Sequence, residues 1–111
     1  YEADVVAPMK AFLENAGVSV VSELNFGERD DRRVARISEA STREAMNEAG
    51  RADGVQAVFA SCTNLRSFGV IDAAEKQLSR PVVSSNSALL WHHARLSGVA
   101  NVPGPGQLFK L

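Results

Sequence analysis

The residues best suited to chemistry form two polar clusters, and each cluster directly follows a short apolar run. They are Ser61-Cys62-Thr63-Asn64 and Ser84-Ser85-Asn86. If both apolar runs are neighbouring parallel strands, the clusters meet beyond the carboxyl ends of the sheet, where open parallel sheets bind their ligands. The pattern therefore predicts one site that contains a thiol, hydroxyls and an amide.

Both clusters are also expected at helix N-termini, because a helical pattern follows each of them. Free backbone N–H groups and the helix dipole at such a position favour anions and favour the thiolate form of a nearby cysteine. A thiolate can act as a nucleophile or transfer a proton. The sequence thus predicts that Cys62 lies beside a site for a carboxylate-sized anion.

Simpler interpretations stay open at this point. A single cysteine at a strand end is often a small buried hydrophobe, and Ser84, Ser85 and Asn86 are common helix caps and turn formers. His92 and His93 are adjacent, so they point to different helix faces and cannot form an i,i+4 metal pair. A non-catalytic α/β binding domain, with an inert Cys62, is therefore the alternative to an enzyme.

Hydrophobic spacing predicts the elements that would position these clusters. Helices are expected over residues 3–16, 32–49, 67–78 and 86–97, with Gly17 and Gly98 ending the first and the last of them. Strands are expected over residues 18–24, 55–61 and 81–84. The run over residues 55–61 is almost wholly apolar, which is typical of a strand covered on both faces.

Strict alternation of helices and strands predicts a three-layer αβα fold with a parallel sheet. Residues 1–111 are expected to form a single α/β domain. The opening helix has no strand before it, which suggests that a first strand is lacking. Because the chain begins at Tyr1 rather than at a methionine, we also expect a fragment or a processed chain.

Composition limits the possible functions. The chain has 111 residues, with 12 Lys and Arg against 13 Asp and Glu, so no charge excess favours nucleic acid or an anionic membrane. No apolar run is long enough to span a bilayer. The one cysteine cannot form an intramolecular disulfide, which agrees with a cytoplasmic location.

Several stretches resemble one protein group closely. They are Phe59-Ala60-Ser61-Cys62-Thr63-Asn64-Leu65-Arg66, Val70-Ile71, Pro81-Val82-Val83-Ser84-Ser85-Asn86, Trp91-His92, Arg95-Leu96 and Gly98. With them the chain resembles the second half of the maleate cis-trans isomerases, arylmalonate decarboxylases and ectoine-utilisation proteins, within the aspartate/glutamate racemase superfamily. The sequence around Cys62 is most similar to that of the ectoine-utilisation branch.

This resemblance implies a flavodoxin-like half-domain of the aspartate/glutamate racemase fold. It implies a cofactor-independent isomerase, racemase or decarboxylase that acts next to a carboxylate of a small mono- or dicarboxylate. Cys62 matches the cysteine of the second half, and the backbone N–H groups of Thr63 and Asn64 match positions that hold substrate. Tyr1 fits a substrate-contacting tyrosine of the family, while Ser85 and Asn86 would line the cleft.

The chain departs from this family pattern in one large respect. Members have two similar halves with a cysteine in each, whereas Cys62 is the only cysteine here. A two-thiol mechanism therefore needs an N-terminal half as a partner. The apolar edges left without that half are expected to favour a homo-oligomer. A role in ectoine breakdown stays open beside maleate isomerisation and decarboxylation.

Overall fold

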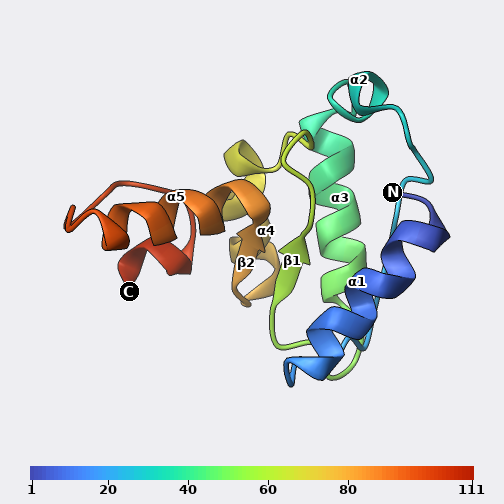
Figure 1. Cartoon of the computed structure of the whole chain (residues 1–111), viewed down its shortest axis with the longest axis horizontal. Coiled ribbons are helices and arrows are strands. Elements are labelled where there is room, and N and C mark those ends of the chain that lie inside the picture. The colour runs from blue at the N-terminus through green and yellow to red at the C-terminus, as the bar shows by residue number, and fades with distance from the viewer.

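A computed structural model describes all residues, 1–111 (Figure 1). The elements, in chain order, are α1 (Ala3–Asn15), α2 (Asp31–Val34), α3 (Glu39–Gly50), β1 (Val58–Ala60), a 3-10 turn η1 (Phe68–Val70), α4 (Ile71–Leu78), β2 (Val82–Ser84), α5 (Ser85–Leu96) and a second 3-10 turn η2 (Gln107–Lys110). None of the helices combines the length and apolar character needed to cross a membrane. Helices and strands thus alternate in the second half of the chain, as the sequence predicts.

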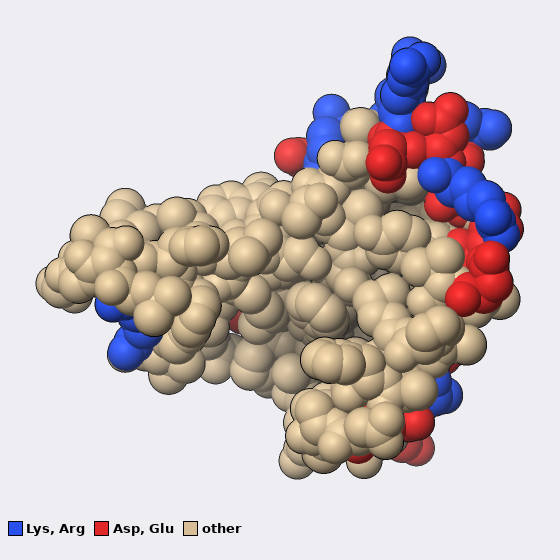
Figure 2. Space-filling model, viewed as in Figure 1, with Lys and Arg blue, Asp and Glu red and all other residues tan.

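The sheet has two parallel strands, β1 and β2, with Val58 opposite Val82 and Ala60 opposite Ser84. The connection between them runs through α4, which packs on α3 and on β2. In the view of Figure 2, charged side chains gather mainly around α2 and the start of α1, and most of the remaining face is uncharged. The parallel pairing confirms the predicted α/β class.

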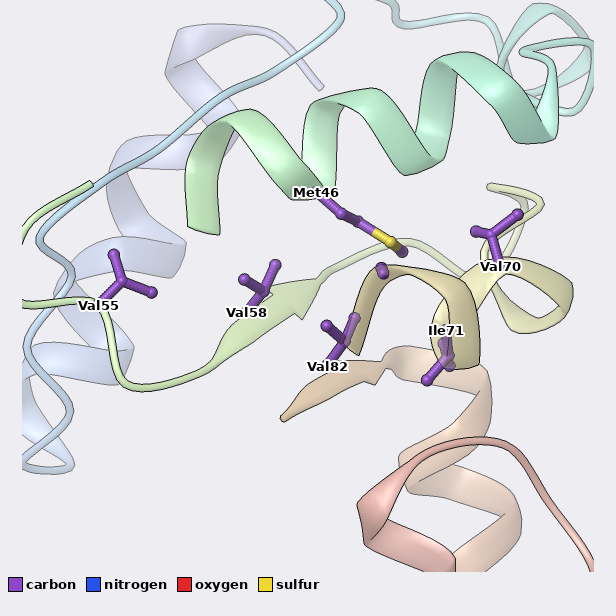
Figure 3. Close-up of a cluster of buried hydrophobic side chains, with 7 residues drawn as sticks. Met46, Val55, Val58, Val70, Ile71 and Val82 are labelled. Atoms are coloured by element: carbon purple, nitrogen blue, oxygen red, sulfur yellow. The ribbon is translucent and has the colours of Figure 1, made fainter. Parts of the chain in front are cut away.

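The core lies where α3, α4 and the two strands meet (Figure 3). Its members are Met46, Val55, Val58, Val70, Ile71, Ala74 and Val82. Ile71 and Ala74 are completely buried, as the helical pattern of residues 67–78 predicts. This cluster fixes the ends of β1 and β2, which carry the two polar clusters.

The predicted strand over residues 18–24 is wrong, because this segment is extended but belongs to no sheet. No backbone N–H from Ser19 to Leu24 donates a hydrogen bond within the chain. A strand is stable only when a neighbour pairs with it, and no strand lies against this segment. Residue type favours the extended conformation, but pairing is a property of the tertiary structure.

The predicted helix over residues 32–49 is also corrected, because it is divided into α2 and α3. Asp30 caps α2 by accepting the Arg32 N–H at 2.8 Å. Ser38 has an extended backbone and accepts the Ser41 N–H at 3.0 Å, so it starts a new helix. A serine N-cap inside a helical pattern is the signal that the sequence interpretation missed.

The strand over residues 55–61 is shorter than predicted and is not covered on both faces. Only Val58–Ala60 pairs, and the side chain of Phe59 is 48% exposed while Val58 is buried. Continuous apolar character is typical of a strand covered by two layers. In this chain one of those layers is incomplete, so the face of Phe59 remains open.

The ends of the helices follow the glycine signals. Gly17 and Gly98 both have positive φ, at 85° and 68°, directly after α1 and α5. After α5 the chain turns back, and Phe109 packs edge-on against Phe68 with ring centroids 6.5 Å apart. Phe109 therefore packs against the body of the molecule.

Candidate active site

Cys62 lies two residues beyond the end of β1, at the carboxyl edge of the sheet. Its side chain is largely buried, with 9% exposure, and it is a free thiol. Its backbone N–H donates to Ala60 O at 3.2 Å, which turns the chain sharply away from the strand. The predicted position of Cys62 at a strand end is therefore confirmed.

Tyr1 brings a phenol to the same thiol. A hydrogen bond with Cys62 raises the pKa of Tyr1 above its ordinary value, and burial and the negative charges of Cys62 and Asp31 act in the same direction. Tyr1 is still 38% exposed, so the phenol lies at the mouth of the site rather than beneath it. The sequence could not show from spacing that these two residues meet.

Thr63 and Asn64 follow Cys62 in an exposed loop. Their backbone N–H groups donate to no group of the chain. The loop is held from the other side, because Asn86 Nδ2 donates to Thr63 O at 3.0 Å. Two free donors thus lie next to the thiol, in a loop tied to the start of α5.

The residues of the second polar cluster have two different roles in the structure. Ser84 is completely buried and caps α5: its Oγ accepts the Ser87 N–H at 3.1 Å, while Ser87 Oγ accepts the Ser84 N–H at 2.9 Å. Ser85 and Asn86 occupy the first turn of the helix and are half-exposed. Asn86 contacts the Cys62 loop, whereas the Ser85 hydroxyl makes no hydrogen bond within the chain.

One expectation about the first cluster is wrong. Cys62 does not lie at a helix N-terminus, because a loop from Ser61 to Ser67 separates β1 from η1 and α4 begins only at Ile71. The dipole argument therefore holds for α5 but not for the thiol loop. The unpaired amides beside Cys62 belong to the loop itself rather than to a helix end.

A cavity of about 580 Å³ opens beside the thiol. Tyr1, Ser61, Cys62 and Leu65 line one end of it, and the rest runs away from the site between residues 18–26 and 54–60. Ser61 Oγ donates to Met9 Sδ at 2.9 Å at this end. The contributions of Met9 and Leu65 carry no signal in the sequence, since both are ordinary apolar residues there.

The histidines play no part in this site. His92 and His93 lie exposed on α5. No group of three or more His, Cys, Asp or Glu side chains is placed to hold a metal ion. The chemistry available at the site is that of one thiol, one phenol and backbone amides.

Comparison with known families finds one match over nearly the whole chain. The model of the family described as arylmalonate decarboxylase matches residues 1–109. No curated protein sequence matches.

Solved structures show the same fold. A crystal structure of arylmalonate decarboxylase is 30% identical over 99% of this chain, with a TM-score of 0.84. A sulfate-associated mutant form of arylmalonate decarboxylase is 29% identical over the whole chain, with a TM-score of 0.89. The maleate cis-trans isomerase of Nocardia farcinica, bound to Tris, shares the fold at 22% identity over 98% of the chain, with a TM-score of 0.90.

The chain spans about half the length of these structures: it covers 50% of the first decarboxylase, 49% of the sulfate-associated form and 45% of the isomerase. The expected half-domain of the racemase-like fold is therefore confirmed. The other half of each relative has no counterpart in the 111 residues.

Proposed function

This chain belongs to the arylmalonate decarboxylase family, and from this premise we propose that its Cys62 transfers a proton at the α-carbon of a small carboxylate. The observation that carries the proposal is the group of donors around the thiol. Cys62 is buried at the carboxyl edge of the sheet, the Tyr1 phenol lines the same cavity, and the two amides that follow Cys62 in the loop are free. Such a group suits a reaction that develops negative charge next to a thiol.

The proposed reaction is a decarboxylation followed by protonation. One carboxylate of a substituted malonate leaves as carbon dioxide, and the electrons of the broken C–C bond form an enediolate on the remaining carboxylate. The N–H groups of Thr63 and Asn64 donate to the enediolate oxygens and stabilise this charge. The Cys62 thiol then gives its proton to the α-carbon, and the resulting thiolate regains a proton from water.

Tyr1 and the second cluster support this geometry. The Tyr1 phenol is a second donor to a carboxylate oxygen at the mouth of the site. Asn86 fixes the loop through Thr63 O. Ser85, whose hydroxyl is free, would line the cleft at the start of α5 once a second half closes it. A sulfate-associated relative is consistent with an anion site in this family.

The chain is proposed to act as the C-terminal half of a two-domain, cofactor-independent enzyme. An N-terminal half would close the opposite side of the cleft and would carry any second thiol, as an isomerase or racemase reaction requires. Maleate isomerisation, in which the thiol adds to the double bond, is the alternative use of the same cysteine. A step in ectoine breakdown also stays a prediction.

The test is an assay of carbon dioxide release from an arylmalonate by the full-length protein. Cys62→Ala and Cys62→Ser should each lower kcat at least about a hundredfold, which is the usual contribution of a positioned general acid. KM should change little, because the carboxylate is held by backbone donors that neither substitution removes. Ser97→Ala, at the exposed C-terminal end of α5, is the control variant.

Maleate and an α-amino dicarboxylate should be assayed in parallel to separate the reaction classes. Turnover of an authentic substrate that survives Cys62→Ala at the level of the control would falsify the role of Cys62. Loss of turnover together with a lowered Tm would instead be attributed to unfolding, so thermal unfolding of each variant is measured alongside.

A further inference from the structure

The start of α1 is held only weakly by packing. None of the residues of α1 is buried, and Tyr1, two residues before the helix, is itself exposed. Glu2 occupies the N-cap position with an extended backbone, yet its side chain caps no N–H group of the helix. The carboxylate of Glu2 is therefore available to a partner outside α1.

That partner is Arg29, which is far from Glu2 in the sequence and lies two residues before α2. The guanidinium of Arg29 donates to Glu2 through Nε and to Asp4 Oδ2 through Nη2, the latter at 2.7 Å. One planar group thus forms ion pairs with two carboxylates at once, which a lysine ammonium does less well. Figure 1 shows the start of α1 beside the chain that leads into α2.

The loop that carries Arg29 is shaped by contacts of its own. Glu28 Oε1 accepts the N–H groups of Arg29 and Asp30, at 3.1 and 3.2 Å. The other oxygen of Glu28 pairs with Arg33 Nε at 3.0 Å. Among the hydrogen bonds and ion pairs of residues 25–30, only those of the Arg29 side chain reach α1 and its N-cap. The loop therefore presents one guanidinium to the start of α1.

Tyr1 connects this group of charges to the thiol site. Tyr1 and Cys62 line the same cavity, and Tyr1 is joined directly to Glu2, which Arg29 binds. The negative charge of Asp31, at the start of α2, contributes to the raised pKa of Tyr1, so the phenol is close to this end of α2. A contact that fixes Glu2 therefore also limits where the phenol can lie.

We propose that Arg29 is a positioning residue, which holds the start of α1 through two ion pairs and thereby keeps the Tyr1 phenol at the mouth of the thiol site. Arg29 itself touches no substrate. Exposed ion pairs contribute little to the stability of a fold, so the effect of Arg29 is expected on the place of Tyr1 rather than on unfolding. Only the kinetic part of the test rests on the proposed function.

Glu2 and Asp4 also have a simpler use, because negative charge near a helix N-terminus stabilises the helix. That use needs neither Arg29 nor its loop, and a cation that binds both carboxylates weakens it. The two interpretations predict different results for Arg29→Ala. The helix dipole alone predicts an unchanged helix start, whereas the proposal predicts that Tyr1 leaves the thiol site.

The first test follows Tyr1 itself. Tyr1 is the only tyrosine, so incorporated fluorotyrosine labels the chain at one place and its fluorine resonance reports the surroundings of the phenol. Cys62→Ala should shift this resonance in the native chain. In Arg29→Ala the resonance should move towards its position in the urea-unfolded chain, and adding Cys62→Ala should no longer shift it. Arg29→Lys, which keeps the charge but loses the planar fork, should lie between the two.

Arg32→Ala is the matched control. Arg32 is exposed in the same charged segment and forms no ion pair within the chain. It removes the same charge, so a general electrostatic effect would appear in both variants, whereas the proposal leaves the resonance of Arg32→Ala at its native position. Glu2→Gln approaches the contact from the other side and should shift the resonance in the same direction as Arg29→Ala. Thermal unfolding of each variant separates movement of Tyr1 from loss of the fold.

Turnover by the full-length protein provides the second readout. Arg29→Ala should lower kcat/KM for an authentic substrate about tenfold, because two exposed ion pairs each contribute a few-fold to the equilibrium that places the phenol. In a Tyr1→Phe background the same substitution should have little effect, since the hydroxyl group that Arg29 positions is already absent. A merely structural role of Arg29 would lower turnover equally in both backgrounds.

Three outcomes would overturn the proposal. A native fluorine resonance in Arg29→Ala would show that Tyr1 is held without Arg29. An equal shift in Arg32→Ala would show that charge in general, and not this contact, is responsible. An equal loss of turnover with and without the Tyr1 hydroxyl would show that Arg29 acts by another route. If no carboxylate substrate is turned over, the proposed function fails, and the fluorine measurement still decides the role of Arg29.

Discussion

At the scale of single residues, the pair of Tyr1 and Cys62 determines what the site can do. The thiol follows from the sequence pattern, since it lies directly after an apolar run. The phenol comes from the other end of the chain and reaches the thiol only in the folded state. A sequence pattern shows chemistry that is local, and it identifies such a partner only through resemblance to a family.

The raised pKa of Tyr1 can be measured directly, because Tyr1 is the only tyrosine. Absorbance of the phenolate should titrate above the ordinary midpoint of about 10. In Cys62→Ala the midpoint should fall towards that value, because the hydrogen bond with Cys62 is the largest cause of the shift, ahead of burial. An unchanged midpoint in Cys62→Ala would show that burial or Asp31 is responsible.

The same shift has a consequence for stability. The pKa of Tyr1 is higher in the folded than in the unfolded chain. The contribution of Tyr1 to the free energy of unfolding is therefore fully present below about pH 10, and it is lost as pH rises through the folded pKa. The difference in unfolding free energy between the native chain and Tyr1→Phe should therefore be constant at neutral pH and shrink at alkaline pH. Urea unfolding at several pH values measures it.

At the scale of elements, α5 presents the second cluster because its start is rigidly capped. Ser84 and Ser87 form a reciprocal pair of hydrogen bonds, and Ser84 is closed to water. Their spacing in the sequence is the signal of a capping box. Ser84 is therefore a helix cap, which is the simpler of the two interpretations of this cluster. Asn86, two residues later, bridges to the Cys62 loop.

Ser84→Ala should lower the free energy of unfolding by about 2 kcal/mol, because a buried Ser87 N–H loses its acceptor. The matched variant is Ser38→Ala at the start of α3, where the cap is exposed and water can replace it. That substitution should cost about 0.5–1 kcal/mol. Equal costs in urea unfolding would contradict the role of burial at Ser84.

At the scale of the whole molecule, one carboxylate joins three parts of the chain. Glu75 on α4 is largely buried and accepts the Val82 N–H at 2.9 Å. It also accepts the Gln107 N–H, at 2.9 Å to its other oxygen, so it ties the C-terminal turn to β2. Asp72 Oδ1 also accepts a hydrogen bond, from the Gly106 N–H at 2.8 Å.

Glu75→Gln should therefore destabilise the whole fold rather than one element. The amide keeps one acceptor oxygen but turns an NH₂ group towards a backbone donor, and leaving a buried donor unpaired costs about 1–3 kcal/mol. Urea unfolding should show this loss, with faster exchange at Gln107 than elsewhere. Glu48→Gln, on the exposed face of α3, is the control and should change little.

The sequence by itself determined α1, α4 and α5, the glycine ends of α1 and α5, the short strand before Ser84 and the place of Cys62 after a strand. These depend on local periodicity, capping and backbone freedom, which a few neighbouring residues decide. Only the tertiary structure decided that residues 18–24 remain unpaired, that Phe59 is open and that Tyr1 meets Cys62. Strand pairing and burial depend on segments far apart in the chain, so residues that favour a strand form one only when a neighbour lies beside them.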